Sequence, residues 1–172
     1  MKYFLPISIL VAAFLIIGFV FGLGLESEIK IDEKIIIEAP NAVVWNIVSN
    51  FEEHHKWQKS IHTLNNYNNS ARQISYNLDD RTIMVNQQIR IRKNANTIDF
   101  IQIGNEEFTQ LRNFGGQIVL TSLADGGTEV MWVMTYSAES VTLKLLNYFY
   151  IEPQLRLLML KNLRSLKSFV EN

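Results

Sequence analysis

The chain has 172 residues, enough for one domain and an appendage, and 48% of them are hydrophobic. Its 16 basic and 17 acidic residues leave a net charge of −1, so no overall positive field favours nucleic acid as a partner. The chain contains no cysteine, which excludes structural disulfides, thiolate metal sites and a cysteine nucleophile.

The chain opens with a long apolar segment, because residues 4–25 carry no charged side chain. As a helix these 22 residues would span about 33 Å, enough for a bilayer core of about 30 Å. The segment is longer than the apolar region of a removable signal peptide, about 7–15 residues, and lacks a good cleavage site. We therefore expect residues 1–28 to be an uncleaved transmembrane anchor with a short linker. A cleaved signal peptide is the alternative.

The tail before this segment is very short, which favours export of the domain on its C-terminal side. The count of basic residues at the two ends of the segment does not decide the orientation. The resulting expectation is a single-pass membrane protein whose domain, residues 29–172, lies on the extracytoplasmic side.

Residues 29–37 alternate, with four isoleucines and Glu33 on one face, which predicts a half-buried strand. Pro40 then suits the first position of a helix, which we expect to run to about residue 50. A short second helix is expected over 52–57. The Asn-rich stretch 65–70 is interpreted as a loop.

The central part of the chain has the period-two pattern of β-strands. Strands are expected at 72–78, 82–92, 97–103, 107–112, 117–123 and 128–136, and the clearest pattern is that of 82–92. Residues 93–96 predict a turn, and Asp125-Gly126-Gly127 predicts a hairpin turn, because glycine tolerates positive φ.

After Ala138 the period becomes helical, and the apolar residues from Leu155 to Val170 gather on one arc. Pro153 divides this long amphipathic helix from an apolar stretch at 141–151. The order predicts one α+β domain, in which a curved antiparallel sheet of about seven strands wraps around the long C-terminal helix. A space between sheet and helix is a natural place for a small molecule.

The run Ile35-Ile36-Ile37-Glu38-Ala39-Pro40-Asn41-Ala42-Val43-Val44-Trp45 resembles the opening of the START/Bet v 1-like (SRPBCC) superfamily, in particular its polyketide cyclase/dehydrase-like group. Trp57 follows where that group often has a second tryptophan, and residues 162–171 are similar to its closing helix. The resemblance covers about residues 29–172. It implies a helix-grip fold with a hydrophobic cavity, in a family that mostly binds lipids, hormones or polyketides and includes some enzymes. The apolar segment at the N-terminus is not part of the usual domain.

The alternation points several side chains toward the expected cavity. Three of them are polar, and a buried polar group without a partner costs about 1–3 kcal/mol. They could orient a ligand, or simply bond to the backbone or to water. The candidate lining residues are Glu33, Tyr76, Val85, Gln87, Phe100, Trp132, Met134, Tyr136, Met159, Asn162 and Leu163.

The three histidines have no metal-ligand spacing, and we interpret them as surface residues. No nucleophile elbow, phosphate-binding loop or dinucleotide fingerprint is present, so no cofactor and no catalytic residue is expected. The basic residues Arg156, Lys161, Arg164 and Lys167 are interpreted as a solvated helix face.

The sequence thus favours binding of an apolar or amphipathic small molecule, lipid or polyketide-like, by a membrane-tethered domain. One alternative is a cyclase or dehydratase, but an acid/base pair held near a substrate proton cannot be named from the sequence. The other is a protein-interaction domain whose cavity is filled. Protein partners and oligomeric state are not indicated by any motif.

Overall fold

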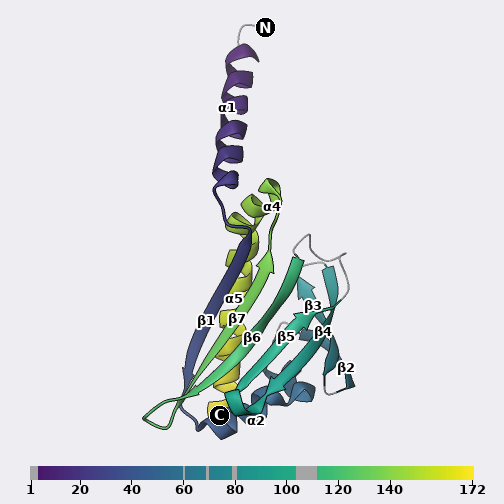
Figure 1. Ribbon diagram of the computed structural model, residues 1–172, viewed down its shortest axis with the longest axis vertical. Coiled ribbons are helices and arrows are strands. Elements are labelled where there is room, and N and C mark those ends of the chain that lie inside the picture. Colours follow the sequence, from purple (N-terminus) through teal and green to yellow (C-terminus); the bar gives the residue numbers. More distant parts are fainter. Residues whose placement is uncertain (1–3, 60, 69, 79–80, 104–111) are drawn as a thin grey trace.

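The computed structural model describes residues 4–59, 61–68, 70–78, 81–103 and 112–172, with the backbone alone for 4–9, 62–68, 76–78 and 81–83. Along the chain (Figure 1), the elements are α1 (Phe4–Leu23), β1 (Glu28–Ile37), α2 (Asn41–Ser49), η1 (Phe51–Glu53), α3 (His54–Trp57), β2 (Ile61–Asn68), β3 (Ala71–Leu78), β4 (Arg81–Arg92), η2 (Lys93–Ala95), β5 (Thr97–Gln102), β6 (Arg112–Ser122), β7 (Thr128–Ser137), α4 (Val141–Leu146), the π-helix η3 (Asn147–Ile151) and α5 (Glu152–Glu171).

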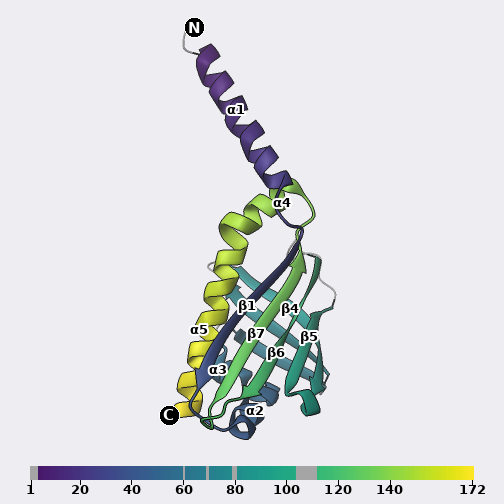
Figure 2. The ribbon, with the colours of Figure 1, turned by 60° about the vertical axis from the view of Figure 1, so that its left-hand side comes forward.

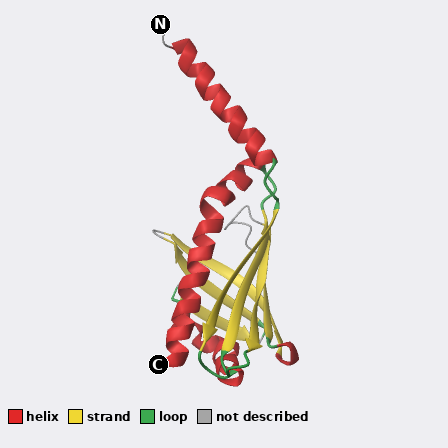
Figure 3. Ribbon diagram, turned by 90° about the vertical axis from the view of Figure 1, so that its left-hand side faces the viewer, coloured by secondary structure: helices red, strands yellow, loops and turns green. Residues whose placement is uncertain are grey.

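The strands form one antiparallel sheet in the order β1-β7-β6-β5-β4-β3-β2. Figures 2 and 3 show this sheet curving around α5, with α2 and α3 at one end of it. The concave side that meets α5 is called the inner face below, and the convex side the outer face. The predicted α+β class and the helix-grip arrangement of an antiparallel sheet on a long C-terminal helix are confirmed.

The alternation predicted for residues 29–37 is present in β1, where Ile31 and Ile37 are fully buried. The core cluster joins these residues to Val44 and Val48 of α2 and to Leu166 of α5. Burial of each such side chain contributes roughly 1.5–3 kcal/mol, so the first strand and the last helix of the domain are held on one core.

The interpretation of residues 65–70 as a loop is wrong for 65–68, which belong to strand β2. Asparagine disfavours strands locally, but here the β2 backbone pairs with β3 along the edge of the sheet. Pairing with a neighbour outweighs this weak local preference. The predicted strand 107–112 lies outside the described residues except for Arg112, which begins β6.

The hairpin turn between β6 and β7 has the expected chemistry. Gly126 has φ +88°, and Asp125 Oδ1 accepts from the Gly127 amide at 3.0 Å. Between β4 and β5 the predicted turn at 93–96 consists of the short helix η2 and the residue that caps it, Asn96, with φ 47°. Each turn therefore uses a residue type that tolerates the left-handed region.

The C-terminal helical region is continuous from Val141 to Glu171, and Pro153 marks an irregularity in it rather than a break. Pro153 occupies one of the first positions of α5, directly after the π-helix. Because proline donates no backbone hydrogen bond and clashes with the preceding turn, local widening into a π-turn accommodates it.

Helix α1 extends away from the domain at the end where α4 lies (Figure 1). Its contact with α4 is close, since a Cβ on Gly22 would lie 2.7 Å from Val141 Cγ1. Phe21 packs edge-on against Tyr148 at 5.6 Å, and Lys144 Nζ donates to the Leu25 carbonyl at 2.8 Å. The boundary between α1 and the domain is therefore bridged by specific contacts.

The predicted membrane span is not supported. In the portion of the chain that the structure describes, no helix is both long enough and apolar enough to cross a membrane. The expectation of a single-pass membrane protein, anchored through residues 4–25, is thereby contradicted.

Candidate ligand-binding face

The residues predicted to line a cavity are largely brought together on the inner face and on α5. Nine of them, from β4, β5, β7 and α5, are each at most 5% exposed. The group comprises Val85, Gln87, Phe100, Trp132, Met134, Tyr136, Met159, Asn162 and Leu163. Six of these belong to the hydrophobic core cluster. Tyr76 lies on β3, and its side chain is outside the described ones.

Glu33 lies on the inner face of β1 but is engaged by an ion pair. Arg156 of α5 donates to Glu33 Oε1 at 3.0 Å and also to Glu152 at 3.0 Å. The Glu33 side chain keeps 19% of its exposure, so this pair lies at the margin of the sheet. Glu33 therefore ties β1 to α5.

Gln87 is held by Arg72, a neighbour that is not among the predicted lining residues. Arg72 is its register partner on β3, is only 5% exposed, and donates from Nε to Gln87 Oε1 at 2.9 Å. This bond turns the NH₂ group of Gln87 away from Arg72. The Arg72 guanidinium also lies over the Phe51 ring, 5.4 Å from its centroid.

His54 completes this network. Its Nε2 donates to the Val48 carbonyl at 2.7 Å, which leaves Nδ1 to accept from Arg72 Nη1 at 2.8 Å and from Gln58 at 3.2 Å. Burial lowers the pKa of His54 to about 3, and the positive charge of Arg72 lowers it as well. His54 is thus a neutral, buried imidazole, and its interpretation as a surface residue is wrong.

The reason for this error is that α3 is a single turn. One of the two adjacent histidines must then face the core while His55 faces solvent. Arg72 could have been found, because it has the same strand parity as Ile74. Its charge alone argued against an inward position. Among the residues that the structure describes, no three His, Asp or Glu side chains gather as a metal site would need.

Tyr136 anchors the other end of the inner face. Its hydroxyl donates to Asn147 Oδ1 at 2.6 Å, and its ring stacks on Phe114 at 5.7 Å. Burial raises the pKa of Tyr136, and the nearby Glu152 carboxylate raises it further. The phenol therefore stays protonated and fixes the π-helix to β7.

Trp132 differs from these residues. It is 4% exposed at the middle of β7, yet its indole Nε1 is buried and has no hydrogen-bond partner among the residues that the structure describes. Its ring lies perpendicular to Phe100, with centroids 6.3 Å apart. An unpaired buried donor of this kind is uncommon in folded proteins.

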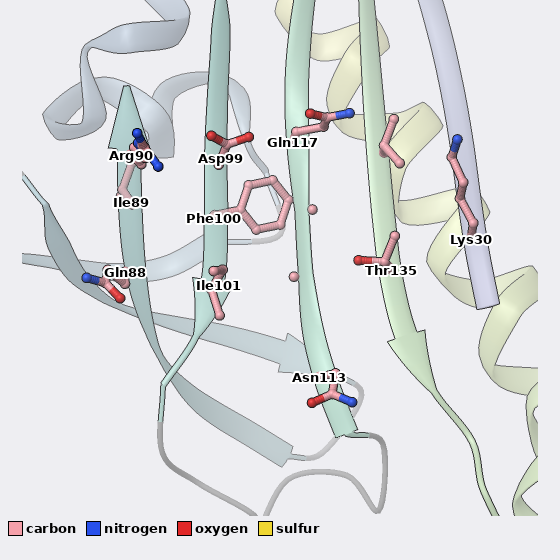
Figure 4. A pocket seen from close by; sticks show the side chains of 13 residues that line it. Lys30, Gln88, Ile89, Arg90, Asp99, Phe100, Ile101, Asn113, Gln117 and Thr135 are labelled. Atoms are coloured by element: carbon pink, nitrogen blue, oxygen red, sulfur yellow. The ribbon is translucent and has the colours of Figure 1, made fainter. Parts of the chain in front are cut away.

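A groove lies on the opposite, outer face of the sheet (Figure 4). Side chains of β4, β5 and β7 border it, and Gly115 and Gly116 of β6 form part of its lining. On the inner side of this strand, a Cβ on Gly116 would lie 2.8 Å from Phe100 Cζ, so the Phe100 ring covers the place where β6 lacks a side chain. The pairing of β6 with β7 is irregular just before these glycines, with a register shift between Arg112 and Gly115.

Comparison with known proteins gives a fold but no family. No family model matches the chain, and no curated protein matches it by sequence. Among solved structures, TTHA0849 from Thermus thermophilus is 13% identical with a TM-score of 0.71, covering 83% of this chain and 97% of that one. The Zhui aromatase/cyclase from Streptomyces sp. R1128 is 7% identical with a TM-score of 0.71, covering 84% and 94%.

A third similar structure, Ara h 8.0201, is 16% identical with a TM-score of 0.62, covering 83% of this chain and 97% of that one. Such low identities establish a shared fold and leave the site residues to be judged on their own chemistry. The helix-grip fold expected from the sequence is thus confirmed over most of the chain.

Proposed function

We propose that the chain binds an apolar or amphipathic small molecule, lipid or polyketide-like, between the inner face of the sheet and α5. The observation that carries this proposal is an apolar lining with a few buried polar groups. Val85, Phe100 and Met159 supply apolar surface, while Gln87 and Asn162 supply polar points. Ligand sites in proteins commonly combine these two features. The similar structures named above share this fold, and one of them is an aromatase/cyclase, which supports a small-molecule site in such a fold.

The polar point at Gln87 favours an amphipathic ligand over a pure hydrocarbon. Arg72 fixes the Gln87 carbonyl, so the amide NH₂ keeps a defined direction in which to donate. Holding a donor in one direction lowers the entropic penalty of binding an acceptor there. The cyclase alternative has no comparable observation, since Glu33 is engaged by Arg156 and Tyr136 donates to Asn147.

The experiment is a fluorescence titration of the full chain with 2-acetylanthracene, an apolar probe, beside thermal melts. We expect saturable binding by the unmodified chain and loss of binding in Val85→Phe and Leu163→Trp. Filling an unoccupied space leaves the melting temperature nearly unchanged, whereas overpacking a filled core costs roughly 1–3 kcal/mol.

A control is needed because Phe149, near α1, is 68% exposed and could bind the probe at the surface. Phe149→Ser should leave saturable binding intact. Absence of saturable binding, together with strong destabilisation by both bulky substitutions, would favour an interaction domain with a filled core instead.

A further inference from the structure

The inner face contains a hydrogen-bond donor whose acceptor is missing from the described residues of the chain. Trp132 Nε1 is buried and unpaired, although the rest of the side chain is packed in the core cluster. Leaving such a donor without an acceptor costs about 1–3 kcal/mol. A buried phenylalanine would fill much of the same space without this penalty. The indole N–H of Trp132 is therefore explained best by a hydrogen-bond acceptor that a ligand supplies.

The surroundings of Trp132 restrict the chemistry of that partner. Its register neighbours are Glu33 on β1 and Ile118 on β6, and paired residues share one face of an antiparallel sheet. Arg156, the basic side chain at Glu33, is committed to Glu33 and Glu152. A carboxylate bound at Trp132 would therefore meet a carboxylate neighbour whose cation is already paired. A neutral oxygen acceptor avoids this repulsion.

We propose that Trp132 determines ligand specificity by donating from its indole N–H to a neutral oxygen, a carbonyl or an ether, on the apolar ligand. This inference rests on the proposed function and names the ligand class for the same site. Hydrocarbons would leave the donor unpaired, and fatty carboxylates would place their charge beside Glu33. Ketones, quinones and aryl ethers match the position best.

The chain offers a matched control for this assignment. Trp57 on α3 is fully buried and its Nε1 likewise has no partner among the described residues, but its ring packs 4.8 Å from His54. Trp57→Phe therefore removes the same kind of donor from a different element. Trp132→Phe removes the donor on the sheet and keeps a smaller aromatic ring there, and Trp57→Phe makes the same reduction in size.

The experiment compares two probes with one framework, 2-acetylanthracene and 2-ethylanthracene, which differ in a carbonyl. Trp132→Phe of the full chain should weaken 2-acetylanthracene binding about fivefold to tenfold and change 2-ethylanthracene binding less than about twofold. Trp57→Phe should change neither affinity by more than about twofold. In ¹H–¹⁵N spectra, the indole signal that Trp132→Phe removes should move downfield with 2-acetylanthracene and not with 2-ethylanthracene.

Two results would overturn the assignment. Equal weakening of both probes by Trp132→Phe would show that the ring packs against the ligand without donating to it. A downfield shift of the Trp57 signal in place of the Trp132 signal would assign the acceptor to α3. If neither probe binds saturably to the unmodified chain, the proposed function itself fails, and this inference fails with it.

Discussion

Two aromatic side chains on β7, four residues apart and on the same face, show the two ways in which this fold uses buried donors. Tyr136 donates its hydroxyl to Asn147 and stacks on Phe114, so its polar atom serves the fold. Trp132 lies on the same strand and is buried to a similar degree, but its N–H has no partner in the described part of the chain. The hydrogen bond of Tyr136 indicates a structural role, whereas the donor of Trp132, on the inner face of the sheet, is the one proposed to meet a ligand.

The network of His54, Arg72 and Gln87 belongs with Tyr136 in this comparison. Its bonds have good geometry, between 2.7 and 2.9 Å along the line from Val48 through His54 and Arg72 to Gln87. Networks of this kind hold elements in one arrangement, because each member loses a partner if its neighbour is removed. It is therefore the place where substitution should affect stability most.

Breaking this network tests its structural role with the largest expected effect. His54→Phe leaves the Val48 carbonyl without its donor and takes an acceptor from Arg72, so we expect the unfolding free energy to fall by about 2–4 kcal/mol. Chemical denaturation with a full transition measures it. His55→Phe, on the exposed neighbour, should change stability by less than about 0.5 kcal/mol. Equal effects of the two substitutions would show that the network does not contribute to the free energy of unfolding.

The pH dependence of stability examines the same network without changing its shape. His54 has its ordinary pKa near 6.5 in the unfolded chain and about 3 in the folded one. Below pH 6.5 the unfolded state takes up a proton that the folded state does not, so stability falls as pH falls. We expect this residue alone to account for about 2 kcal/mol between pH 7 and pH 5. His54→Phe should flatten the profile by that amount, and an unchanged slope would contradict the buried neutral imidazole.

Tyr136→Phe sharpens the comparison on β7 itself. It removes only the hydroxyl and leaves Asn147 Oδ1 buried without its donor, so we expect a loss of about 1–2 kcal/mol. Thermal melts of the ligand-free chain measure this. A Tyr136→Phe variant as stable as the unmodified chain would mean that the bond to Asn147 contributes little.

Trp132→Phe is the matched change with the smallest expected effect. The unliganded protein loses a donor that has no partner among the described residues, and relief of that unpaired donor offsets part of the cost of the smaller ring. We therefore expect its stability to change by less than about 1 kcal/mol. The same melts, without ligand, provide the measurement. A fall of more than about 2 kcal/mol, beyond what the lost ring volume explains, would show that the Trp132 N–H already has a partner within the fold.

The sequence predicted the sheet and the long helix well because their periodicity is strong. The apolar residues of strand β4 recur at every second position, and those of helix α5 recur with the helical period. These two patterns distinguish a strand from a helix. It misplaced residues 65–68, since pairing between β2 and β3 is a tertiary effect that local propensity does not report. The apolar run at the N-terminus predicted a membrane span that the described part of the chain does not contain.

The candidate site was predictable in its apolar part and not in its polar part. Alternation placed Val85, Phe100 and Trp132 inward, and the structure buries all three. Whether a buried polar group is bonded within the fold or is available to a ligand depends on partners that lie far apart in the chain. His54 and Arg72 are 18 residues apart, and Glu33 and Arg156 are 123 apart. No local pattern specifies such pairs, so only the folded arrangement distinguishes Trp132 from Tyr136.

The most direct test is a ¹H–¹⁵N titration of the full chain with 2-acetylanthracene, followed residue by residue. Binding at the inner face predicts saturable shifts for residues of β4, β5, β7 and α5, including the Trp132 indole, with one probe molecule per chain. Shifts confined to α1, α4 and the π-helix, where apolar side chains are exposed, would mean surface adsorption. That result, or shifts that never saturate, would contradict ligand binding between the sheet and α5.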